Sequence, residues 1–163
     1  MLGNNPDIEA LSKAEHHHAE CFLQFVRDFE PQPILVEKVV AYIDPKTNMP
    51  LYCGTIDLVA KLNDGVVWLI DYKASSSQAR PSHALQAAAY THATHWVDVE
   101  TGKLHPMPEC ERAAVVLLNG GSGDRGYRAF ELDVSPVVFS VFKNLLRIHN
   151  FSKIEERVII GEL

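Results

Sequence analysis

Three β-rich runs follow one another between residues 34 and 73, and only short turn segments separate them. The runs are ILVEKVVAYI (34–43), LYCGTIDLVA (51–60) and VVWLIDYK (66–73), and the connecting segments contain DPKTNMP and LNDG. β-Branched and aromatic residues bounded by Gly, Pro, Asn and Asp are typical of strands and turns. Connections this short have no room for a crossover helix, so the sequence predicts an antiparallel three-stranded meander.

Helical patterns precede and follow the meander. Asn5-Pro6-Asp7 predicts the start of a helix over 6–30, and Ser82 predicts the cap of a second helix that runs through HALQAAAYTHATHWV. Two more strands, 113–119 and 127–133, are expected around GGSGDRG, and Ser135-Pro136 begins a final amphipathic helix. The predicted order is α-βββ-α-ββ-α, an α+β fold in a single domain over 1–163 with its core in 34–149.

Composition narrows the function classes. A chain of 163 residues with an average content of charged and apolar residues folds without disulfides or a structural metal. Its 3 cysteines are too few for the four thiolates of an iron-sulfur cluster, so none is expected, and they favour a reducing compartment. We find no signal peptide pattern and no apolar stretch long enough to span a bilayer, which predicts a cytoplasmic protein without membrane association. The net charge of −6 argues against binding nucleic acid by bulk charge.

Acidic residues line up across the predicted meander. If Asn63-Asp64-Gly65 forms a three-residue hairpin loop, Asp57 faces Asp71 on the neighbouring strand. The turn over 44–50 likewise places Glu37 opposite Asp57. Strand alternation then puts Asp57, Asp71 and Lys73 on one face of the sheet, and the other face carries Ile56, Leu58, Ile70 and Tyr72.

Facing carboxylates repel one another, so this arrangement needs a compensating charge. Mg²⁺ or Mn²⁺ supplies it, because these ions take oxygen ligands from one or two carboxylates. Lys73, two residues beyond Asp71, shares its face and is placed to orient a water or to neutralise charge that develops on a phosphate. This pattern indicates phosphodiester cleavage. The alternative interpretation is that the acids are ordinary surface residues paired with Lys73 and Lys38.

The succession of motifs resembles the PD-(D/E)XK nuclease superfamily. The motifs are G-T-I-D (54–57), D-Y-K (71–73) and Q-x-x-x-Y (Gln86 and Tyr90), and their spacing is closest to the branch of the RecB nuclease domain and phage exonucleases. The resemblance implies a restriction-endonuclease-like core. It also implies that Asp57 and Asp71 are metal ligands, that the Tyr72 backbone carbonyl is a third candidate ligand, and that Lys73 is the catalytic lysine.

Other site residues follow from the same resemblance. Glu37 matches the acid that the family often carries in or near the metal shell, and Gln86 and Tyr90 share a helix face that is expected to look into the active site. Ile56 stands where the nominal motif has Pro. The chain also lacks the upstream G-T-x-x-H motif, whose His is a metal ligand in the family. Its only upstream histidines are His16 to His18, for which a polar helical stripe is favoured over a metal-binding role.

Weaker candidates lie elsewhere in the chain. His83, His92 and His95 suggest zinc, but no fourth ligand stands at a familiar spacing. The Gly-rich segment 120–126 joins two predicted strands and lacks the sequence of a P-loop. It is more typical of a hairpin tip, with Arg125 and Arg128 available to contact DNA.

These features together predict a Mg²⁺- or Mn²⁺-dependent deoxyribonuclease. The resemblance favours an exonuclease over an endonuclease, acting in recombination, replication or repair, and it fits a phage-encoded protein working in the host cytoplasm. DNA is the expected partner, and the resemblance is compatible with a homo-oligomer and with a helicase or recombinase partner. Two alternatives stay open: a catalytically degenerate DNA-binding or assembly subunit with the nuclease fold, and an oligomeric structural protein.

Overall fold

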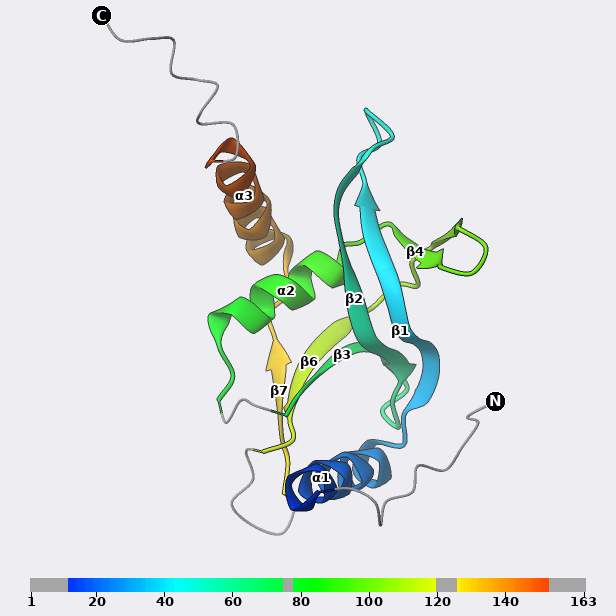
Figure 1. Cartoon of the computed structure of the whole chain (residues 1–163), viewed down its shortest axis with the longest axis vertical. Helices are drawn as coiled ribbons and strands as arrows, with labels where there is room; N and C mark the ends of the chain where they lie inside the picture. Colours follow the sequence, from blue (N-terminus) through cyan, green and yellow to red (C-terminus); the bar gives the residue numbers. More distant parts are fainter. Residues whose placement is uncertain (1–11, 75–77, 120–125, 153–163) are drawn as a thin grey trace, which may run out of the picture.

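A computed structural model describes residues 12–74, 78–119 and 126–152. Its elements, which Figure 1 shows in chain order, are α1 (Lys13–Phe29), β1 (Gln32–Ile43), β2 (Pro50–Lys61), β3 (Val67–Lys73), α2 (Pro81–Thr91), β4 (His95–Asp98), β5 (Lys103–Pro106), β6 (Arg112–Leu117), β7 (Arg128–Leu132) and α3 (Pro136–Ser152). The fold is therefore α+β, with a mixed sheet flanked by helices.

Within the described residues, seven strands form one sheet in the order β5-β4-β1-β2-β3-β6-β7. The meander is confirmed, because β1 pairs antiparallel with β2 and β2 pairs antiparallel with β3. β6 then lies parallel to β3, and β7 returns antiparallel at the edge. The parallel pair is possible because the chain between β3 and β6 is long enough to cross over the sheet and includes α2.

The second helix is shorter than expected. α2 ends at Thr91, and the segment predicted as its continuation forms β4, which pairs with β1 on one side and β5 on the other. Pairing with the free edge of β1 therefore overrides the helical pattern of residues 92–97. The start also differs, because Arg80 is the N-cap and Pro81 the first helical residue, so Ser82 lies inside the helix.

The first helix begins at Lys13. Ser12 is its N-cap and forms a capping box with Glu15, whose carboxylate accepts bonds from the Ser12 amide at 2.8 Å and the Ser12 hydroxyl at 2.6 Å. The backbone of Ser12 is extended, so one uninterrupted helix over 6–30 is not formed. The predicted start at Asn5-Pro6-Asp7 lies outside the described residues. At the other end, Glu30 adopts a left-handed conformation and closes the helix.

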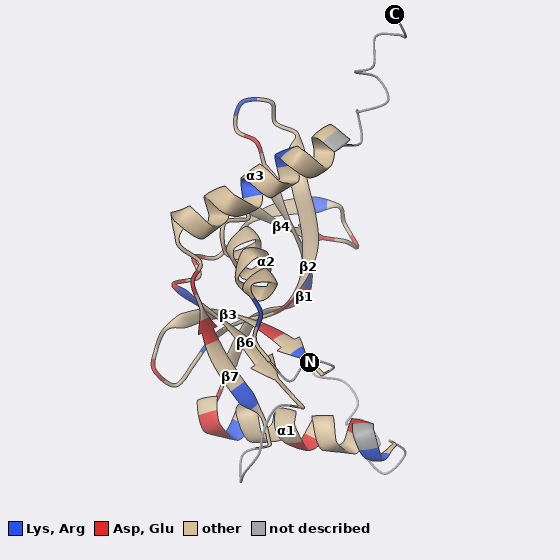
Figure 2. Cartoon of the chain, turned by 90° about the vertical axis from the view of Figure 1, so that its left-hand side faces the viewer, with Lys and Arg blue, Asp and Glu red and all other residues tan. Residues whose placement is uncertain are grey.

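Helices cover the two faces of the sheet. Figure 2 shows α1 on one side of β3, β6 and β7, with α2 and α3 on the other. The core under α1 contains Cys21 and Phe25, packed on Leu58 and Ile70. A second core lies under α2 and includes Val40, Ile56, Val59, Leu69 and Ala87.

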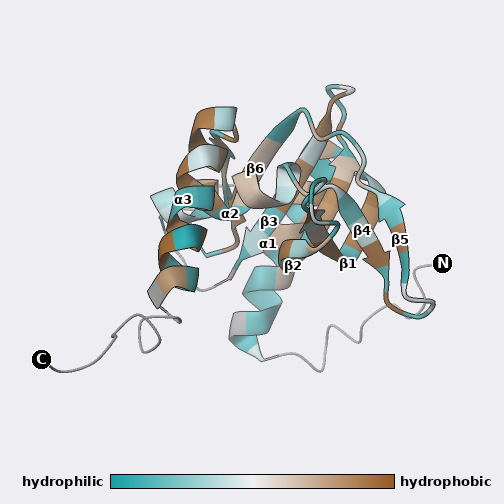
Figure 3. Cartoon of the chain, turned by 90° about the horizontal axis from the view of Figure 1, so that it is seen from above, coloured by the Kyte–Doolittle hydropathy of each residue, from teal (hydrophilic) through white to brown (hydrophobic). Residues whose placement is uncertain are grey.

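α3 packs against α2 and the start of β2. Its ring of Phe139 stacks on His92, and Phe142 meets Tyr52 edge to face. The opposite side of α3 carries five exposed apolar residues: Val137, Val141, Leu145, Ile148 and Phe151. Figure 3 shows hydrophobic bands, in brown, along α3. None of the helices in the described residues has the length and apolarity needed to cross a membrane.

Candidate functional site at a fork in the sheet

The predicted acids lie where the sheet divides. The ladder between β2 and β3 runs from Lys61 and Val67 to Leu58 and Ile70 and ends there. Beyond this point β2 continues beside β1, whereas β3 continues to Lys73 beside β6. The two pairs of strands diverge, as Figure 1 shows. The register is the one expected for the three-residue loop, so Asp57 and Asp71 occupy the first position past the last pair, at the fork.

Asp57 bridges the two arms of the fork. Its Oδ2 accepts a hydrogen bond of 2.7 Å from the backbone amide of Tyr72. A side chain thus satisfies an amide that has lost its ladder partner on β2. Because the acceptor group reaches a backbone amide of the neighbouring strand, the Asp57 carboxylate points along the sheet toward β3. The prediction that it projects from one face, as strict alternation requires, is wrong.

Asp71 is a buried carboxylate paired with a lysine. It is only 7% exposed, and Lys73 Nζ lies 2.8 Å from Oδ1 and 2.8 Å from Oδ2. Lys73 donates a hydrogen bond to Oδ1 and contacts buried Oδ2 at the same distance as an ion pair. The sequence correctly placed Asp71 and Lys73 on the same face, two residues apart.

Burial dominates the acidity of Asp71. Desolvation raises its pKa above the ordinary value, and the hydrogen bond and charge of Lys73 oppose this shift without cancelling it. The negative charge of Asp57 raises the pKa further, whereas His83 lowers it. The two aspartates therefore interact electrostatically. A positive charge at the fork would stabilise both carboxylates in their ionised form.

Glu37 lies opposite Asp57 in the register but in an unusual conformation. Val36 pairs with Leu58 and Lys38 with Ile56, and these two pairs bracket the Glu37–Asp57 position. Glu37 has φ of 46°, in the left-handed region that a non-glycine residue rarely adopts. The ladder skips this position. Glu37 is exposed and, with Asp57, lines a cavity under α1.

The left-handed conformation at Glu37 reverses the alternation of side chains between the two faces in β1 and in β2. Leu35 and Val40 pack in the same core, and so do Ile56 and Val59, although strict alternation would separate each pair. Leu58 consequently faces α1 while Ile56 faces α2. The prediction that Ile56 and Leu58 share a face is therefore wrong, because the left-handed residue in β1 shifts the pleat.

Gln86 and Tyr90 lie together on α2, as their spacing predicted. Gln86 Nε2 donates a hydrogen bond of 3.2 Å to the Tyr90 hydroxyl. The Tyr90 ring packs against Gly54 of β2 so closely that a Cβ added at Gly54 would lie 2.6 Å from it. This end of α2 therefore rests on the β2 arm of the fork.

His83 is the site neighbour that the sequence interpretation missed, since it was weighed only as a zinc ligand. It lies near the start of α2, on the same helix face as Gln86 and Tyr90, and it affects the pKa of Asp71. Its Nδ1 accepts a 3.2 Å hydrogen bond from the Arg80 amide. The helical spacing from Gln86 was the signal that could have identified it.

Three other histidines have local partners. His16 pairs with Glu20 at 3.8 Å, and His17 lies 3.6 Å from the Cys21 sulfur. His95 contacts the Thr94 hydroxyl at 2.9 Å. In the parts of the chain that the structure covers, no three His, Cys, Asp or Glu side chains come together in an arrangement that could by itself hold a metal ion.

The candidate DNA-contacting arginines are only partly visible. Arg125 lies outside the described residues. Arg128 is exposed at the start of β7, and its guanidinium lies 4.7 Å from the centre of the Phe130 ring. Its contact with DNA stays a prediction.

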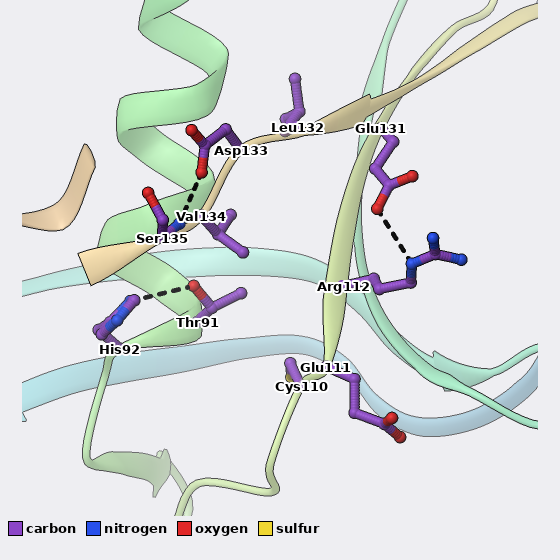
Figure 4. A pocket seen from close by; sticks show the side chains of 10 residues that line it. All are labelled: Thr91, His92, Cys110, Glu111, Arg112, Glu131, Leu132, Asp133, Val134 and Ser135. Carbon is purple, nitrogen blue, oxygen red and sulfur yellow. Dashed lines mark hydrogen bonds and ion pairs between the residues drawn. The ribbon is translucent and has the colours of Figure 1, made fainter. Parts of the chain in front are cut away.

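A polar pocket of about 420 Å³ lies away from the fork, between the end of α2 and strands β6 and β7 (Figure 4). Arg112 and Glu131 form an ion pair of 3.0 Å across it. His92 Nδ1 lies 2.9 Å from the Ala88 carbonyl oxygen. The polar groups of this pocket thus largely bind one another or nearby backbone, and none of the predicted acidic ligands lines the pocket.

Comparison with known proteins found no matching protein-family model, and a search of the curated proteins found no match. Function therefore has to be inferred from the geometry of the fork. That geometry defines an α+β protein in which two aspartates and a lysine meet where a mixed sheet divides.

Proposed function

We propose that this protein is a divalent-metal-dependent nuclease of the PD-(D/E)XK type that hydrolyses phosphodiester bonds in DNA as an exonuclease. The observation that carries the proposal is the meeting of Asp57, buried Asp71 and Lys73 at the fork. The motifs 54–57 and 71–73, and the three-stranded meander followed by a helix and a parallel strand, support the same assignment.

The carboxylates suit Mg²⁺ or Mn²⁺. Asp71 is buried and Lys73 contacts its Oδ2 at 2.8 Å, and Asp57 raises the pKa of Asp71 by repulsion. A hard cation that takes oxygen ligands would offset the repulsion between the two carboxylates. Asp57 and Asp71 would hold the ion, and the family resemblance adds the Tyr72 carbonyl and Glu37. When bound, such an ion supplies Lewis acidity toward a phosphate and lowers the pKa of a coordinated water.

Lys73 has the reach required of a charge-stabilising residue. Its side chain is 29% exposed although its Nζ contacts buried Asp71, so the ammonium group stands between the buried acid and solvent. A phosphate held at the fork would lie beside this charge. Lys73 would then stabilise negative charge that develops on the phosphate oxygens in the transition state. Gln86 and Tyr90, on helix α2 beside the fork, would limit how a DNA strand enters the site.

A labelled DNA digestion with Mg²⁺ or Mn²⁺ tests the proposal. Wild-type protein should degrade free-ended DNA and spare end-blocked DNA. Asp71→Asn and Lys73→Gln should each lower the rate roughly 100- to 1,000-fold, as loss of one electrostatic group in an active site does. Lys61→Gln, an exposed lysine on β2, is the matched control and should cleave like wild type. Equal rates for wild type and Asp71→Asn would refute the assigned chemistry.

A DNA-binding or assembly subunit that retains the nuclease frame is the second candidate. The close contact of Lys73 with both oxygens of Asp71 favours it, because the acid already has a cationic partner. This candidate predicts intact DNA in every divalent ion with binding preserved. Metal titration separates the two: Mn²⁺ should raise the unfolding temperature of the nuclease, and Asp71→Asn should abolish that rise.

A further inference from the structure

An apolar cavity adjoins the fork on the α1 side. Its volume is about 560 Å³, within the range of small-ligand sites, and its apolar walls are Phe22, Leu23, Val26, Pro33, Val36 and Tyr72. The walls come from α1, β1 and β3. Asp57, the residue that bridges the fork, also lines this cavity. The cavity therefore reaches the fork at Asp57, although Asp71 and Lys73 do not line it.

The walls leave large apolar side chains accessible to solvent. Phe22 is 39% exposed, Leu23 is 42% exposed and Val36 is 49% exposed. Exposed apolar groups that gather at one hollow, rather than singly, indicate a binding surface. The rings of Phe22 and Tyr72 meet edge to face at 5.3 Å, which gives the hollow an aromatic wall.

Two carboxylates give the cavity a polar specificity. Glu37 and Asp57 both line it, and because Asp57 Oδ2 already accepts a hydrogen bond from the Tyr72 amide, the exposed Glu37 carboxylate is the acceptor open to a ligand. Glu37 is held in the left-handed conformation, a strain that persists where the surroundings require it and that clusters at ligand sites. A ligand for this cavity needs a flat apolar body to contact aromatic and proline side chains. It also needs N–H donors at its edge.

We infer that this cavity binds the terminal nucleobase of a DNA strand whose phosphate lies at the fork. A nucleobase combines a stacking face with edge amino groups, and carboxylates accept hydrogen bonds from such groups. The inference rests on the proposed nuclease function and extends it to the recognition of strand ends. An internal base of a duplex cannot enter without leaving its stack, whereas a terminal base is unstacked at little cost.

The test uses double-stranded oligonucleotides with 2-aminopurine as the 5′-terminal, the 3′-terminal or an internal base of one strand, with the full chain in EDTA and in Ca²⁺. Binding should change the fluorescence of one terminal probe and leave the internal probe nearly unaltered. Phe22→Ala should weaken binding of that end roughly 5- to 150-fold, the range for losing one base–aromatic stack. Leu23→Asp keeps the test valid if Phe22→Ala destabilises α1. Leu104→Asp, on β5 at 52% exposure, is the matched control and should bind like wild type.

The outcomes separate this inference from the proposed function. Two results would overturn the proposed nucleobase-binding cavity and leave the proposed nuclease function standing: DNA cleavage without a fluorescence change of either terminal probe, or DNA cleavage with Phe22→Ala and Leu23→Asp both binding like wild type. Conversely, a fluorescence change of a terminal probe that both variants abolish, with no DNA cleavage in any metal, would support the nucleobase-binding cavity and refute the nuclease function. Equal responses of terminal and internal probes also overturn the inference. A terminal cytosine or adenine binding more tightly than thymine supports the role of the carboxylates.

Discussion

Replacing Asp71 by Asn should stabilise the metal-free protein at neutral pH. Asp71 is 7% exposed, and desolvation, the largest influence on it, raises its pKa above the ordinary value of 3.8. The folded protein therefore holds this proton more tightly than the unfolded chain does, so ionisation of Asp71 costs folding free energy. Asn has nearly the same shape and carries no charge. The orphaned Lys73 is 29% exposed and can turn its ammonium group to water.

The magnitude follows from two opposed effects. An ion pair between lysine and a carboxylate, with the lysine partly exposed, contributes about 0–1 kcal/mol to the free energy of unfolding. Desolvation of a buried carboxylate costs several kcal/mol before the protein relaxes around it. We expect a net gain of about 1 kcal/mol, which corresponds to a rise in unfolding temperature of about 2–4 °C for a chain of this size. The gain should be present above the raised pKa and shrink as the pH falls toward 3.8, because wild-type Asp71 is then protonated in the folded state.

Thermal unfolding followed by circular dichroism in EDTA, at pH 7 and near pH 4, measures this difference. Asp98→Asn is the control of opposite sign, because a hydrogen bond from Thr101 lowers the pKa of exposed Asp98. The reasoning would be refuted if Asp71→Asn unfolds at a lower temperature than wild type at pH 7 and the difference between the two unfolding temperatures does not shrink near pH 4. If Lys73→Gln then restores the stability of Asp71→Asn, the orphaned lysine outweighs the desolvation of the acid.

Three further predictions concern packing, capping and thiol reactivity. Gly54→Ala should lower the free energy of unfolding by about 1–3 kcal/mol through the clash with Tyr90, measured by urea unfolding, and Tyr90→Leu should recover part of the loss. Ser12→Ala removes the cap of α1 and should cost about 1 kcal/mol in the same assay; an unchanged midpoint would contradict the capping box. Burial raises the pKa of Cys110 to about 12, so iodoacetamide at pH 8 should label exposed Cys53 first, and comparable rates would contradict the burial.

The meander and its register were predictable because local chemistry determines them. Asn63-Asp64-Gly65 closes a tight hairpin, so the pairing of β2 with β3 follows from counting residues outward from the turn. The same counting gave the pairing of β1 with β2 around Glu37. The position of Lys73 beside Asp71 followed from the two-residue period of a strand.

What the sequence did not reveal depends on contacts distant along the chain. Strand β4 forms because residues 95–98 pair with the edge of β1. The helical pattern around His95 therefore predicted the wrong secondary structure there. The left-handed Glu37 and the direction of the Asp57 carboxylate arise where β2 leaves β3, and that separation depends on β6. No nearby residue marks the fork, and therefore the hydrogen bond from the Tyr72 amide could not be anticipated.

The parallel pairing of β3 with β6 affects the order in which the chain folds. Hairpins between consecutive strands close short loops, but β6 must return past α2, β4 and β5 before it can join β3. We expect the first three strands to pair early and β6 to dock late. Substitution of buried Val115 by Ala should then mainly accelerate unfolding, with little change in the refolding rate measured by stopped flow. The fork that brings Asp57, Asp71 and Lys73 together would therefore be among the last parts of a newly made chain to form.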